Sequence, residues 1–137
     1  MNATDFIQLL ILVIAILGLM FTILSFRQQL RQNFFTDYTK RYQKIMLHLP
    51  EEFYTNEVTY KELQNEARAY LRAYFDLCSE EYYLKTSGKI DKEVWENWKQ
   101  GIVYIFNKEL ILEAWSHFNQ ENYQDFSKWI STKVIKK

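Results

Sequence analysis

The residues that could take part in catalysis or metal binding are few in this sequence. It contains two histidines, His48 and His117, and one cysteine, Cys78. Glu113 precedes His117 by four positions, so the two could share one face of a helix, but no E-x-x-H or H-E-x-x-H motif supports a metal site there. His48 lies just before Pro50, where a cation near the last carbonyls of a helix is favourable. Cys78 falls on the apolar face of an expected helix, which favours a small core residue over a nucleophile.

Nucleotide-binding and hydrolase motifs are absent as well. The sequence has no Walker loop, no G-x-G-x-x-G, no G-x-S-x-G and no cysteine cluster. We therefore predict a protein that is not an enzyme and that has no cofactor and no metal.

Two arginines, Arg68 and Arg72, are the candidates for binding an anion. They lie four residues apart on an expected helix, among the acidic side chains of Asp76, Glu80 and Glu81. One interpretation is an exposed helix face with modest ion pairs. The other is an arginine pair that holds an anionic ligand such as a phosphate.

The four tryptophans also admit two interpretations. They could line a pocket that stacks a nucleobase, or they could pack in a hydrophobic core. Their spacing on the expected helices favours the core: Trp95, Trp98, Trp115 and Trp129.

The element that must position the rest of the chain is an apolar stretch over residues 6–26, FIQLLILVIAILGLMFTILSF. It has no charged residue and no proline, and about 20 apolar residues are enough for a helix to cross a bilayer. A signal peptide is disfavoured, because no basic residue precedes the stretch and no cleavage motif follows it. The sequence therefore predicts a transmembrane anchor at residues 1–26 with the lipid bilayer as its partner.

Charged residues beside the anchor predict its orientation. Asp5 is the only charged side chain before it, whereas five basic side chains follow closely: Arg27, Arg31, Lys40, Arg41 and Lys44. Because Lys and Arg accumulate on the cytoplasmic side, we expect the N-terminus outside the cell inner membrane and the rest in the cytoplasm. The single cysteine suits that reducing compartment.

Beyond the anchor, charge is unevenly distributed. Residues 51–125 carry 15 Asp and Glu against 8 Lys and Arg, whereas residues 126–137 carry four lysines and no acid. The basic residues that follow the anchor would lie near anionic lipid, which favours each by about 1 kcal/mol. The basic C-terminal end, with Lys133, Lys136 and Lys137, either returns to the bilayer or stays solvated.

Apolar periodicity predicts an all-α fold, with the anchor helix continuing into a bundle of four to five helices. We expect the first helix over about 5–48, ended by Pro50. A Thr59/Glu62 capping box should begin the next, which ends at Gly88. Asp91 and Asn107 should cap two further helices, and a last one should run over about 121–133. The expected parts are the anchor, a juxtamembrane extension over 27–50 and a helical domain over 51–137.

Along the anchor and the residues after it, steps of three and four give a face with a period of seven, on which eight of nine positions are small or polar. The positions are Gln8, Ile11, Ala15, Gly18, Thr22, Ser25, Gln29, Gln32 and Thr36, and Ile11 is the exception. Membrane helices associate through such faces, and a seven-residue period indicates left-handed packing. We therefore predict a homo-oligomer through Ala15, Gly18, Thr22 and Ser25. The alternative is a plain anchor that merely tolerates these residues.

Several stretches resemble a family of small, single-pass bacterial membrane proteins of unassigned function. They are the anchor with the residues up to Leu49-Pro50, the run RAYFDLCSEEYYL over 72–84, GKID over 88–91, and the positions Val94, Trp95, Trp98 and Gly101. The resemblance implies a bacterial origin and a membrane-anchored helical architecture, and it carries over no active site. The layout is also similar to small membrane effectors of antiviral defence, in which a cytoplasmic domain senses a signal nucleotide.

Two functions follow from these observations. The first is a non-enzymatic interaction or scaffold module that holds a partner, or another copy of itself, at the membrane. The alternative is a ligand-gated membrane effector that permeabilises the inner membrane when its helical domain binds a ligand, such as a nucleotide. The sequence does not identify a protein partner, and it gives no reason to expect a nucleic acid polymer as partner.

Overall fold

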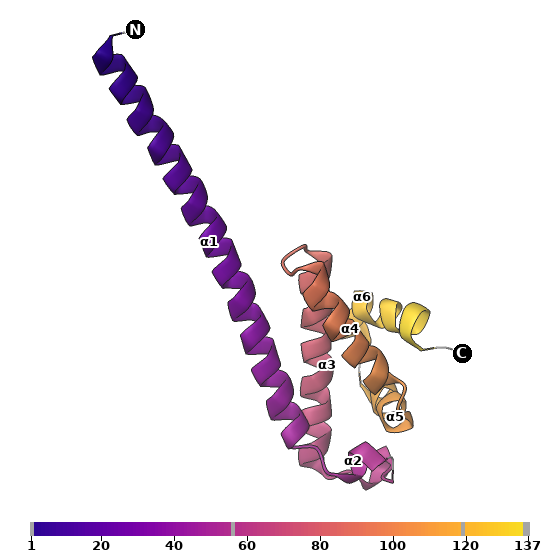
Figure 1. The fold of residues 1–137 in the computed structure, drawn as a ribbon. Helices are drawn as coiled ribbons and strands as arrows, with labels where there is room; N and C mark the ends of the chain where they lie inside the picture. The colour runs from indigo at the N-terminus through magenta and orange to yellow at the C-terminus, as the bar shows by residue number, and fades with distance from the viewer. Residues whose placement is uncertain (1, 56, 119, 136–137) are drawn as a thin grey trace. The chain divides into compact units, whose positions relative to one another are not determined.

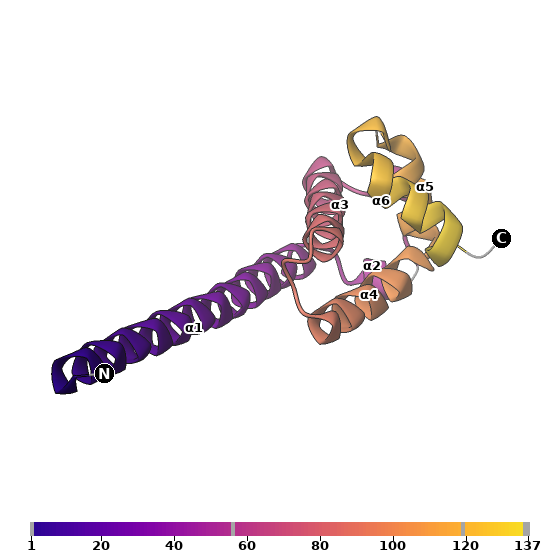
Figure 2. The same cartoon turned by 90° about the horizontal axis from the view of Figure 1, so that it is seen from above.

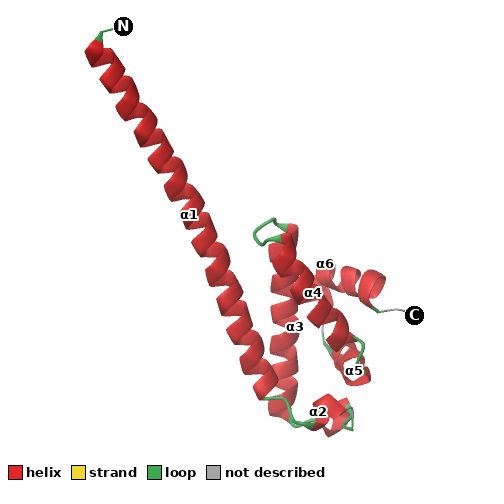
Figure 3. Cartoon of the chain, in the orientation of Figure 1, coloured by secondary structure: helices red, strands yellow, loops and turns green. Residues whose placement is uncertain are grey.

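The computed structural model describes residues 2–55, 57–118 and 120–135, and these residues form helices, turns and connecting segments with no strand (Figure 3). The predicted all-α class is therefore confirmed. The chain divides into two compact units, residues 1–35 and residues 36–137, and the second is called the helical domain below.

The first unit is the N-terminal part of α1 (Ala3–Leu47), the long indigo helix of Figure 1. By length and composition, this helix can cross a membrane. Its large apolar side chains between Phe6 and Phe26 are exposed, with exposed fractions of 45–73%. The predicted helix over about 5–48 is confirmed to within two residues at each end.

The last turns of α1 belong to the helical domain. Tyr38 and Ile45 are buried there, and α1 ends at Leu47 because Pro50 disfavours helical geometry at the residue before it. A short helix follows, α2 (Glu52–Thr55), whose Phe53 is fully buried.

The predicted capping box forms, but it begins a different element. The Glu62 carboxylate accepts hydrogen bonds from the Thr59 N–H at 2.7 Å and the Thr59 hydroxyl at 2.9 Å, which closes the single 3₁₀ turn η1 (Tyr60–Glu62). The chain then extends at Leu63, which is buried. The long helix α3 (Asn65–Thr86) starts only after this residue. The prediction that the box begins the long helix is therefore wrong.

The predicted end of α3 and start of α4 are confirmed. Gly88 has a φ of +67°, a conformation that glycine adopts without steric cost. Its N–H and that of Lys89 donate to the carbonyls of Lys85 and Leu84, so two carbonyls at the helix end are satisfied. Asp91 occupies the N-cap position of α4 (Lys92–Phe106).

The C-terminal helices differ from the prediction. Asn107 ends α4, and its side-chain amide donates to the carbonyl of Val103 at 2.8 Å, whereas Lys108 holds the N-cap position of α5 (Glu109–His117). The predicted helix over about 121–133 consists of three segments. They are the 3₁₀ turn η2 (Gln120–Tyr123), α6 (Gln124–Trp129) and the π-helical turn η3 (Ile130–Val134).

The core of the helical domain is aromatic. Figure 2 shows α3, α4 and the α5–α6 pair around a common centre, where Phe75, Phe106 and Phe126 are almost completely buried. The Phe75 ring centroid lies 5.0 Å from that of Trp115 and 5.6 Å from that of Phe106. Edge-to-face and tilted arrangements predominate, as the quadrupoles of aromatic rings favour.

Candidate functional site

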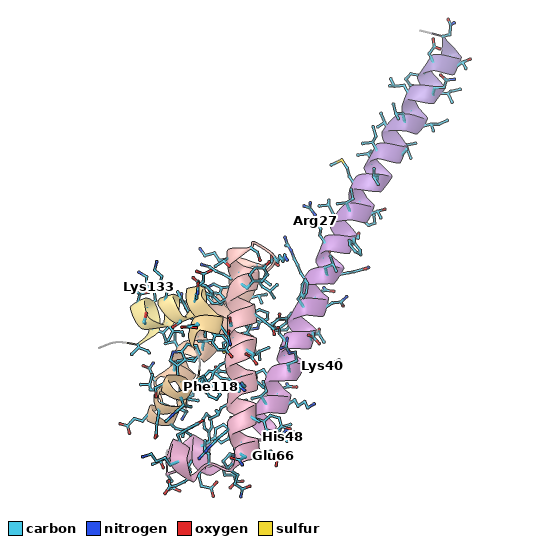
Figure 4. The ribbon with its side chains drawn as sticks, turned by 180° about the vertical axis from the view of Figure 1, so that it is seen from behind. Arg27, Lys40, His48, Glu66, Phe118 and Lys133 are labelled. Carbon is cyan, nitrogen blue, oxygen red and sulfur yellow. The ribbon has the colours of Figure 1, made fainter. Side chains whose placement is uncertain are left out.

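The two arginines predicted to bind an anion each face a different aromatic ring. The Arg68 guanidinium carbon lies 4.9 Å from the centroid of Tyr60, and its Nη2 donates to the carbonyl of Lys61 at 2.9 Å. The Arg72 guanidinium carbon lies 5.4 Å from the centroid of Phe118, which Figure 4 labels. Cation–π contacts of this kind hold the side chains against the domain. An anion site at this pair stays a prediction.

The two histidines stack on tyrosines, and His48 and Glu113 contact the backbone. The His48 Nδ1 lies 2.7 Å from the carbonyl of Lys44, and its ring stacks on Tyr70 at 4.3 Å. The His117 ring stacks on Tyr60 at 4.6 Å, and the Glu113 carboxylate accepts a hydrogen bond from the Tyr60 N–H at 3.2 Å. Three His, Cys, Asp or Glu side chains suitable for a metal are not grouped anywhere in the part of the chain that the structure describes.

The tryptophans fall into two classes. Trp95 and Trp115 are buried, whereas Trp98 and Trp129 are half-buried. Trp98, which we expect to be largely buried, keeps only part of its surface exposed, and its ring stacks on Tyr38 at 5.3 Å. Cys78 is fully buried, as expected for a core residue, and burial raises the pKa of its thiol well above the usual value.

The most elaborate polar cluster joins the end of α1 to α3. The Arg41 guanidinium makes a two-pronged ion pair with the Glu80 carboxylate, with N–O distances of 2.6 Å and 3.0 Å. The Tyr38 hydroxyl donates to the same carboxylate at 3.1 Å. The hydrogen bond from Arg41 lowers the pKa of Glu80, and burial together with Glu80 raises the pKa of Tyr38 to about 12. Near neutral pH, Arg41 therefore stays protonated, Glu80 stays ionised and the Tyr38 hydroxyl keeps its proton.

Glu81 is the functional candidate that sequence reasoning missed. One of the two interpretations of this run of charged residues places it on an exposed helix face, but the structure buries it, with only 6% of the residue exposed. Burial raises the pKa of its carboxyl from the usual 4.5 to about 8; the Arg41 charge opposes this rise and the Glu80 charge adds to it. A signal was present, because Glu81 follows Tyr74 by seven positions and Cys78 by three and so shares their apolar face.

A pocket of about 470 Å³ lies between the end of α1 and the start of α3. The buried residues Leu49, Leu63 and Ala67 contribute to its apolar part. His48 and Glu66, which Figure 4 labels, also line it. Glu52, Glu57 and Glu62 make the remaining lining strongly acidic. This pocket therefore suits a basic group rather than an anion.

The predicted association face lies in the first unit. The Thr22 hydroxyl donates to the Gly18 carbonyl of its own helix at 2.9 Å, so toward a neighbouring helix it can act as an acceptor. A methyl group added at Gly18 would meet no atom within 4 Å in the single chain. The surface at Gly18 is therefore open to close approach by a second helix.

Comparisons of this chain with protein families, with curated proteins and with solved structures found no match.

Proposed function

We propose that this chain is a single-pass protein of a bacterial inner membrane, with its N-terminus outside and its helical domain in the cytoplasm. The domain serves as a non-enzymatic interaction module that holds a partner, or another copy of the chain, at the membrane. The family resemblance of the sequence supports the bacterial assignment, and the basic residues after the anchor support the orientation.

The observation that carries the membrane assignment is the uncovered apolar surface of α1. A core helix of a soluble protein buries its apolar side chains, but those of residues 6–26 remain 45–73% exposed in this chain. A continuous apolar surface of this extent marks a membrane or protein contact. At 1.5 Å per residue, the stretch matches the ~30 Å hydrocarbon thickness of a bilayer.

Cysteine labelling in spheroplasts tests the topology. A cysteine placed at Asn2 should react with a membrane-impermeant maleimide in intact spheroplasts, and one placed at the exposed Lys85 should react only after permeabilisation. The native Cys78 is fully buried, so the parent chain supplies the background. Labelling of the Asn2 cysteine only after permeabilisation would exclude the proposed orientation.

The continuity of α1 favours a ligand-gated effector as a second candidate. The same helix carries the polar residues Thr22 and Ser25 and ends inside the helical domain, so a ligand that rearranges the domain could act on the anchor directly. An effector should collapse the membrane potential when overexpressed with its activating ligand, as a potential-sensitive dye would report.

A double variant, Thr22→Leu with Ser25→Leu, separates the two candidates. It keeps the anchor apolar and removes the polar groups that a pore would need. Toxicity that this variant abolishes would favour the effector. An interaction module should leave growth and membrane potential unchanged in both the parent and the variant.

A further inference from the structure

The pocket of about 470 Å³ between the end of α1 and the start of α3, called the acidic pocket below, offers apolar contact as well as charge. Leu49, Leu63 and Ala67 are buried where they line it, and Val58 is half-buried. Leu47 lines the same pocket and is 84% exposed, the highest fraction among the large apolar side chains of the described residues. Covering Leu47 would remove apolar surface from water, which is favourable.

The charge of the acidic pocket comes from four exposed glutamates: Glu52, Glu57, Glu62 and Glu66. None of the described lysines and arginines lines it. Within the described residues, Glu52, Glu57 and Glu66 form no ion pair. Hydrogen bonds from Thr59 lower the pKa of Glu62, so its carboxylate is ionised near neutral pH. The pocket therefore carries negative charge that no side chain of its own lining neutralises.

A lysine or arginine side chain combines the two properties that this lining asks for. Its aliphatic stem can lie on apolar surface while its charged head stays near water, and its N–H groups form strong hydrogen bonds with carboxylates. A simple aliphatic polyamine would meet the glutamates but would leave Leu47 uncovered. A peptide in which a basic residue stands next to an apolar one can do both.

We propose that the acidic pocket binds a basic peptide segment of a partner protein, with lysine or arginine at the glutamates and an adjacent apolar side chain on Leu47. The inference rests on the proposed function as an interaction module and names the class of partner that the module holds. Cytoplasmic segments of other membrane proteins have a suitable composition, because lysine and arginine accumulate on that side.

The test uses the full chain in vesicles of phosphatidylcholine, a lipid without net charge, filled with a self-quenching dye. The probe is the peptide GKLKKLG with blocked ends and a neutral red-emitting dye, and its fluorescence anisotropy reports binding above a background of protein-free vesicles. Binding should saturate and should weaken as salt is added, because salt screens exposed charges. Two comparison peptides separate the contributions: GSLSSLG lacks the charge and GKSKKSG lacks the apolar side chains.

Two double variants with the same change in net charge test the location. Glu57→Gln with Glu66→Gln removes two carboxylates from the pocket and should weaken binding of GKLKKLG by about fivefold or more. Glu93→Gln with Glu109→Gln removes two exposed carboxylates from α4 and α5 and should change binding less than about twofold. Leu47→Ser should weaken binding of GKLKKLG and leave that of GKSKKSG unchanged. Far-UV circular dichroism checks that every variant is folded.

Three results would overturn the inference. One is an equal loss of affinity in the two double variants, which would assign binding to general charge. Another is equal affinity for GKSKKSG and GKLKKLG, which would exclude the contact with Leu47. The third is the absence of saturable binding.

The proposed function is tested separately by the cysteine labelling described above. A chain with the expected labelling pattern that does not bind the peptide would leave the membrane-held module in place without this site. Pocket-dependent binding that releases dye from the vesicles would confirm the site and assign the chain to the effector class.

Discussion

Replacing Trp95 by alanine should destabilise the helical domain far more than the same change at Trp98. Trp95 is 5% exposed, and its ring centroid lies 5.5 Å from that of Trp129 and 6.0 Å from that of Tyr82. Truncating a buried tryptophan to alanine costs about 3–5 kcal/mol. For a domain of about 100 residues, each kcal/mol lowers the Tm by roughly 4–8 °C, so Trp95→Ala should lower it by about 12–40 °C.

Trp98 provides the matched comparison on the same helix. It is half-buried and stacks on Tyr38 at 5.3 Å, and such a pair contributes about 0.5–1.5 kcal/mol beyond its buried area. Trp98→Ala should therefore cost only about 1–2 kcal/mol.

The assay is thermal unfolding of the full chain in detergent micelles, followed by far-UV circular dichroism so that the loss of one tryptophan does not alter the probe. The apolar part of α1 should stay helical in the micelle, and the cooperative transition then reports on the helical domain. Equal decreases in Tm for the two variants would refute the distinction between a buried and a stacked tryptophan.

Three further predictions concern pH and glycine. Burial raises the pKa of Glu81 to about 8. The unfolding free energy should therefore fall by up to ~5 kcal/mol as the pH rises from 4.5 to 8, at about 1.4 kcal/mol per pH unit. Urea titrations at several pH values should show this fall in the parent and not in Glu81→Gln. Gly88→Ala should destabilise the domain by about 1 kcal/mol, because Gly88 has a φ of +67°. Gly101 lies in α4 with open space at its Cβ, so Gly101→Ala should stabilise the domain by up to ~1 kcal/mol. Urea denaturation would measure both changes. Gly18→Ile should weaken crosslinking through a cysteine at Ser25, Gly18→Ala should weaken it less, and Leu12→Ile should leave it unchanged; equal crosslinking of the parent and Gly18→Ile would leave α1 as a plain anchor.

The features of the fold that could be predicted from the sequence are those that depend on nearby residues. The apolar stretch, the stop at Pro50, the turn at Gly88 and the cap at Asp91 are each specified by a few neighbouring side chains. The prediction from neighbouring residues was wrong at Thr59, where a capping box was expected to begin the long helix. A capping box specifies a turn and does not specify the length of the helix after it. Leu63 is drawn into the core and interrupts the helix there.

The C-terminal half shows the same limit. An asparagine such as Asn107 can cap the start of a helix or bond to the carbonyl one turn before it, and at the junction of α4 and α5 the second bond forms. The spacing of apolar residues alone does not distinguish these two outcomes.

The polar sites were harder to predict because their environment comes from distant parts of the chain. Arg68 and Arg72 are neighbours on α3, but their partners Tyr60 and Phe118 belong to other segments. Glu81 has the right spacing for the apolar face of α3, but its burial depends on elements from other parts of the chain that pack against that face. A sequence pattern predicts which face of a helix is apolar, but it does not predict which other segments pack against that face.

The division of the chain into two units has a consequence for spectroscopy. All ten tyrosines and four tryptophans lie between residues 38 and 129, whereas the only aromatic residues among residues 1–35 are phenylalanines. Absorbance at 280 nm and intrinsic fluorescence therefore come entirely from the helical domain, whatever lipid or detergent surrounds α1. A tryptophan substituted for Phe21 would add an emission that reports on the first unit and on the polarity of its surroundings.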